Sequence, residues 1–118
     1  MKRKCVVAGA WLRTGVDIVV DEGTSSPDEV QQVLDQVPEG IHAFHVVLTA
    51  DFDASLARAR ADSGRGISKD PRFLRAAHDT FALHLPHLPS NLRLHVEGQE
   101  PGELARQVLT SLPGPSLR

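Results

Sequence analysis

The chain has 118 residues, of which 41% are hydrophobic and 24% are charged, a balance typical of one soluble globular domain. A formal net charge of -2 with both signs interspersed does not favour binding to nucleic acid or to a membrane surface. The single cysteine, Cys5, excludes an intrachain disulfide and a CxxC metal site, so the cytoplasm is the expected location.

The first predicted elements are a helix and a strand. Residues 3–14 predict a helix that ends at Gly15, because glycine is a common helix stop. The β-branched apolar run at residues 18–20 predicts a short strand that is buried on both faces.

Helix-start signals come next. Ser26 can cap a helix that Pro27 opens, and Glu29 completes a capping box. An apolar stripe with helical spacing then extends this helix to Val37. Residues 44–49 predict a second interior strand.

The second half of the chain repeats the alternation. Asp51 is expected to cap a helix, which leads into a basic loop at residues 63–68. A helix is predicted from Pro71 to about Leu85.

A strand at residues 92–96 and a helix at residues 101–112 complete the predicted elements, and residues 113–118 are expected to form a loose tail. Strands separated by helices imply parallel pairing. The predicted fold is therefore a single α/β domain over residues 1–118, a three-layer parallel sheet flanked by helices.

Ligands of open α/β sheets bind beyond the carboxyl ends of the strands. That rule selects three segments, Asp21-Glu22-Gly23, Thr49-Ala50-Asp51 and Glu97-Gly98-Gln99. The carboxylates of Asp21 and Glu22 could act as a general base or hold hydrated Mg²⁺. The alternative is that Asp21 ends a strand and caps a turn.

Three arginines form a second candidate group. Arg58 and Arg60 lie near the end of a predicted helix, and Arg65 lies between two glycines. A guanidinium on such a loop could close over a phosphate, although a solvated helix face explains the same pattern. The six histidines do not show metal-ligand spacing, and the absence of a GxSxG motif leaves a hydrolase triad without support.

The order of these pieces resembles the P-loop kinases of the adenylate, shikimate, gluconate and chloramphenicol phosphotransferase group. Residues 11–22, 54–66 and 94–104 carry the likeness. The resemblance implies catalytic roles for Asp21 or Glu22, which would contact the acceptor or hydrated Mg²⁺, and for Arg65. It further implies that the nucleotide contacts four residues, with phosphates near the arginines and adenine near the glycine and glutamine: Arg58, Arg60, Gly98 and Gln99.

One departure from this family concerns the phosphate-binding loop. The motif GxxxxGK(S/T) is absent, and the only lysines are Lys2, Lys4 and Lys69. We therefore expect a remnant or truncated form of an ATP-dependent small-molecule or nucleotide kinase that is inactive alone, with ATP and Mg²⁺ as cofactors only if an upstream part supplies the loop.

The alternative is a non-catalytic binding or oligomerisation module, in which an exposed sheet edge pairs with a partner or with a second copy. A different α/β enzyme that uses Asp21 and Arg65 ranks last.

Overall fold

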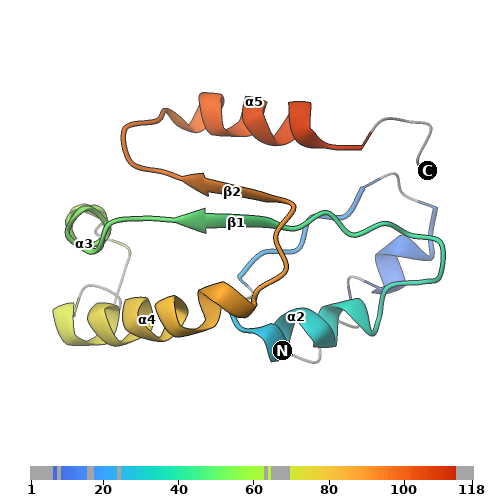
Figure 1. Cartoon of the computed structure of the whole chain (residues 1–118), viewed down its shortest axis with the longest axis horizontal. Helices are drawn as coiled ribbons and strands as arrows, with labels where there is room; N and C mark the ends of the chain where they lie inside the picture. The colour runs from blue at the N-terminus through green and yellow to red at the C-terminus, as the bar shows by residue number, and fades with distance from the viewer. Residues whose placement is uncertain are drawn as a thin grey trace.

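The computed structural model describes residues 7, 9–15, 18–23, 25–62, 64 and 70–113. Residues 9–12 are helical, and the turn after them ends at Gly15, which has a φ of 84°. The remaining elements, in chain order, are α2 (Pro27–Leu34), β1 (Val46–Thr49), α3 (Phe52–Ala61), α4 (Pro71–His84), the short 3-10 helix η2 (Leu85–His87), β2 (Leu92–His95) and α5 (Pro101–Ser111) (Figure 1).

The sheet is much smaller than the sequence predicts. Within the described ranges it consists of β1 and β2 alone, which pair in parallel, so the prediction of a three-layer parallel sheet is wrong. Residues 18–20 do not form a strand, and Ile18 and Val20 are 63% and 83% exposed. The physical reason is that a β-branched run favours extended backbone, but only a hydrogen-bonded neighbour turns it into a strand.

The two faces of the sheet differ in character. Paired residues of an in-register parallel sheet share a face, and side chains alternate along each strand. One face is entirely apolar and consists of Val46, Leu48, Leu92 and Leu94; the other consists of Val47, Thr49, Arg93 and His95. Leu94 is 7% exposed but Leu48 is 51% exposed, so the apolar face is covered at β2 and open at β1.

Local capping signals explain where α2 and α4 begin, whereas Asp51, the predicted cap of α3, makes no side-chain cap hydrogen bond. The Glu29 N–H donates to Ser26 Oγ at 3.3 Å, so the predicted Ser26 cap is confirmed. The Glu29 carboxylate accepts from the Ser26 hydroxyl at 3.2 Å and from the Ser25 N–H at 3.3 Å rather than from the Ser26 N–H, so the capping box is not completed. The helix that Ser26 caps, α2, ends at Leu34, three residues short of the predicted stripe. At α4, Asp70 accepts a hydrogen bond from the Arg72 N–H at 2.8 Å.

Burial is sparse for a chain of this size. The buried apolar side chains of the described residues are Val47, Ala59 and Leu94. The chain exposes 8445 Å² at a mass of 12.8 kDa, whereas a compact monomer of that mass exposes about 6,300 Å². Its radius of gyration is 15.9 Å, against about 13.5 Å for a compact domain of this length. The single chain therefore exposes more surface than a closed domain of its size.

Candidate functional site

Polar side chains gather where β1 and β2 end. Thr49 lies directly opposite His95 in the ladder, and the Val96 N–H donates to the Thr49 carbonyl at 2.9 Å. Because both strands run in the same direction, the residues that follow them, Asp51 and Glu97, lie at this same edge. Two of the three segments selected from the sequence are thus brought together.

His95 joins the two strands through its ring. Its Nδ1 lies 2.8 Å from Thr49 Oγ1, and its Nε2 lies 3.2 Å from Asp51 Oδ1. The His95 side chain is 48% exposed. The result is a hydroxyl, an imidazole and a carboxylate in line at a solvent-accessible strand end.

Beside this group, Arg58 of α3 reaches across to Glu97. Its guanidinium donates two hydrogen bonds to the Glu97 carboxylate, at 3.1 and 3.2 Å, and one to Ser55 Oγ at 3.3 Å. The hydrogen bonds from Arg58 lower the pKa of Glu97, and the same bonds raise the pKa of Arg58. Arg58, which the resemblance assigns to a nucleotide phosphate, therefore has a carboxylate partner within the chain.

The turn after β2 positions the next predicted residues. Gly98 has a φ of 76°, a left-handed conformation that favours glycine. Gln99 donates from Nε2 to the His95 carbonyl at 2.8 Å and accepts from Gln107 Nε2 at 2.6 Å. Its amide thus fastens the strand end to α5.

The remaining predicted residues lie elsewhere. Asp21 lines a hollow of about 110 Å³ with residues 44–47 and Leu88, at the amino ends of the strands. Glu22 and Arg60 are exposed, and Arg65 lies outside the described residues. The described part of the chain therefore does not bring Asp21 to the edge where Arg58 lies.

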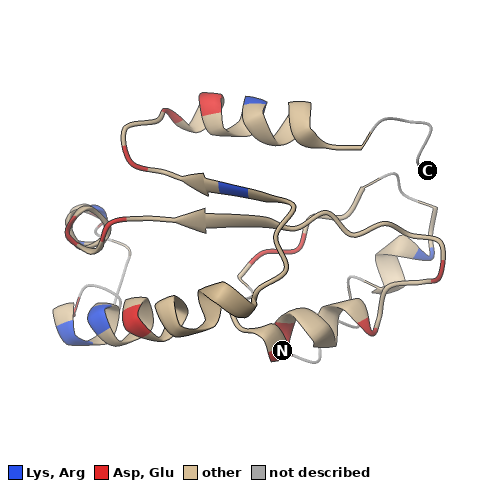
Figure 2. Cartoon of the chain, in the orientation of Figure 1, with Lys and Arg blue, Asp and Glu red and all other residues tan. Residues whose placement is uncertain are grey.

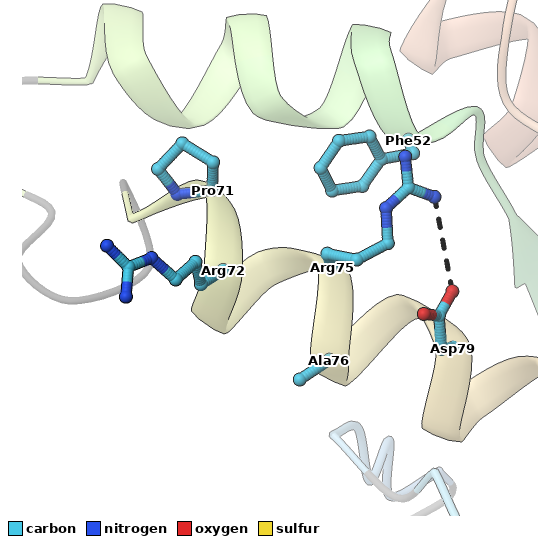
Figure 3. A pocket seen from close by; sticks show the side chains of 6 residues that line it. All are labelled: Phe52, Pro71, Arg72, Arg75, Ala76 and Asp79. Carbon is cyan, nitrogen blue, oxygen red and sulfur yellow. Dashed lines mark ion pairs between the residues drawn. The ribbon is translucent and has the colours of Figure 1, made fainter.

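A second hollow separates α3 from α4 (Figure 3). The Arg75 guanidinium lies 3.7 Å above the centre of the Phe52 ring and 4.0 Å from Asp79. His78 packs edge-on against Phe52, and its Nε2 lies 3.1 Å from the Ala50 carbonyl oxygen. These contacts anchor α4 to the segment that follows β1.

Two further kinds of site have no support in the described ranges. No group of three or more His, Cys, Asp or Glu side chains there is arranged to hold a metal ion. None of the helices seen there combines the length and the apolarity that crossing a bilayer requires.

The sequence reasoning missed the joint arrangement of Thr49, His95 and Asp51. The usable signal is that Thr49 and His95 are the last residues of two parallel strands, which become neighbours only if the strands pair in register. Comparison of the chain with protein-family models, curated proteins and solved structures found no match.

Proposed function

We propose that the chain is a self-association module in which two copies join along β1. The observation that carries this proposal is Leu48, which is half-exposed on the apolar face of a two-stranded sheet. A large apolar side chain on a sheet face is ordinarily covered by another layer. Here the covering layer would come from the second copy.

The side of β1 that faces away from β2 carries backbone N–H and carbonyl groups that a further strand could pair with. The carbonyls of His45 and Thr49 accept hydrogen bonds from the β2 side. Because backbone groups alternate in direction along a strand, those of Val46 and Leu48 are directed away from β2. They are the groups that an added strand would pair with.

No charged side chain in the segment around β1 discourages the pairing of this strand with another chain. Residues 41–50 contain no Asp, Glu, Lys or Arg and no proline. Strand β1 is accordingly tan throughout in Figure 2, where charged residues are blue or red. In contrast, β2 carries Arg93. Natural edge strands are commonly guarded by charges or proline, so β1 is the unguarded strand.

The excess exposed area of the whole chain is larger than the area that one partner of a standard dimer interface buries. The chain exposes about 2,100 Å² more than a compact monomer of its mass, and a standard interface buries about 800 Å² of each partner. A two-fold contact would place the uncharged stretch of residues 41–50 against its own copy, without opposing like charges. We therefore name a second copy of this chain as the partner.

Sedimentation equilibrium of the wild type, Leu48→Lys and Leu83→Lys tests the proposal. Leu83 is the matched control, because it is an exposed leucine on α4, 76% accessible and outside the sheet. We expect a wild-type and Leu83→Lys dimer, and a Leu48→Lys dissociation constant raised about tenfold or more, because an unpaired ammonium is costly to bury. A wild-type monomer throughout the concentration range would refute the proposal.

The relation to P-loop kinases, with ATP and Mg²⁺ as cofactors, stays a prediction from the resemblance. The same holds for the cytoplasmic location, which rests on the single Cys5.

A further inference from the structure

The Thr49, His95 and Asp51 side chains have a geometry that self-association does not use. From it we propose that Thr49 is a nucleophile that accepts the acyl group of small, uncharged activated esters and releases it to water. Its neighbours are those that activate a hydroxyl: an imidazole at 2.8 Å, and a carboxylate 3.2 Å from the far side of that ring. The Thr49 and His95 side chains, which carry this activity, lie on the face of the sheet opposite Leu48.

The hydrogen positions follow from the chemistry of the three groups. The Asp51 carboxylate is an acceptor, so its contact with His95 requires the hydrogen to be on Nε2. The Nδ1 atom of the neutral ring is then an acceptor, and the Thr49 hydroxyl donates to it. Asp51 thus acts as a positioning residue that keeps Nδ1 free to take the threonine proton.

Substrate can reach these atoms. The His95 side chain is 48% exposed, and the group lies beyond the carboxyl ends of two parallel strands, where ligands of such sheets bind. Thr49 and His95 lie on the opposite face from Leu48, so covering Leu48 does not itself cover these two side chains.

The surrounding charges indicate the substrate class. Asp51 and Glu97 lie at the site, and the Arg58 guanidinium is held by Glu97. An anionic substrate would meet these two carboxylates at the strand ends, whereas Arg93 lies on the same face two residues before His95. Neither hollow described above includes Thr49, so a short acyl group fits better than a long one.

The reaction balances with water as the only co-reactant. Thr49 Oγ1 attacks the ester carbonyl carbon and its proton passes to His95 Nδ1; the bond to the leaving oxygen breaks, and the leaving group departs with that proton. Water then attacks the acyl-threonine ester and gives its proton to Nδ1, which returns it to Oγ1. The products are the free acid and the alcohol.

The test uses p-nitrophenyl acetate, with p-nitrophenol release and the mass of the intact and digested protein as readouts. We expect one acetyl group on Thr49 and a rate that falls about 100-fold in His95→Ala. Thr49→Val should lose both the adduct and the rate, and Thr49→Ser should keep them. Thr80→Val, an exposed threonine on α4, is the matched control and should behave as wild type.

Asp51→Asn and Asp51→Glu test the positioning role. The amide variant should lose most of the rate, and the longer carboxylate should restore part of it, which a merely structural role would not do. Circular dichroism confirms that each variant is folded. Acetylation confined to histidines, lysines or the amino terminus, or an unchanged rate in folded Thr49→Val, would overturn the proposal.

Discussion

Glu97 shows how a side chain placed at a strand end acquires a structural partner. Its carboxylate accepts two hydrogen bonds from Arg58 and one, at 3.4 Å, from the Asp51 N–H. These three contacts join α3, the turn before it and the end of β2. Arg58 and Glu97 therefore form a clamp between elements, and both side chains reach solvent, so salt weakens it.

We predict that Arg58→Ala raises the pKa of Glu97, because hydrogen bonds from Arg58 lower that pKa in the folded chain. A depressed carboxyl pKa contributes stability above the unfolded-state value and loses it as the pH falls through the folded-state value. Carbon-13 NMR titration of the Glu97 carboxyl measures the change. Arg72→Ala, which removes an exposed arginine of α4, should leave the titration unaltered, and an equal shift in both variants would contradict the clamp.

At the scale of elements, α2 depends on its first turn. Ser26→Ala removes the side-chain acceptor of the Glu29 N–H and should lower the free energy of unfolding by about 1 kcal/mol. Urea unfolding followed by circular dichroism measures this change. Ser90→Ala, an exposed serine before β2, serves as the control and should be neutral; equal losses in the two variants would show that the cap contributes nothing.

Local signals were sufficient to predict helix starts but not sheet membership. Ser26 and Asp70 cap their helices with bonds that span two or three residues, so the sequence nearby determines them. Residues 18–20 carry equally clear β-branched chemistry, yet a strand needs a partner that lies far away in sequence. Thr49 and His95 become neighbours for the same nonlocal reason, across 46 positions. The starts of α2 and α4 could therefore be predicted, whereas strand number and the joint site could not.

At the scale of the whole molecule, sparse burial and an open flank of the sheet have one common explanation. Val47, Ala59 and Leu94 are the buried apolar side chains of the described residues, and Leu48 remains half-exposed beside them. Apolar surface stabilises the folded state only when it is removed from water. Each Å² of apolar area that is buried contributes about 25 cal/mol. The proposed association of two copies at β1 would supply that cover.

Amide hydrogen exchange at increasing protein concentration tests this account most directly. The N–H groups of Val46 and Leu48 are directed to the outer side of β1, so we predict slower exchange in residues 41–50 as dimer forms. Exchange in α4 should stay constant and serves as the internal reference. Exchange in residues 41–50 that is independent of concentration, in a sample that stays monomeric, would contradict the account.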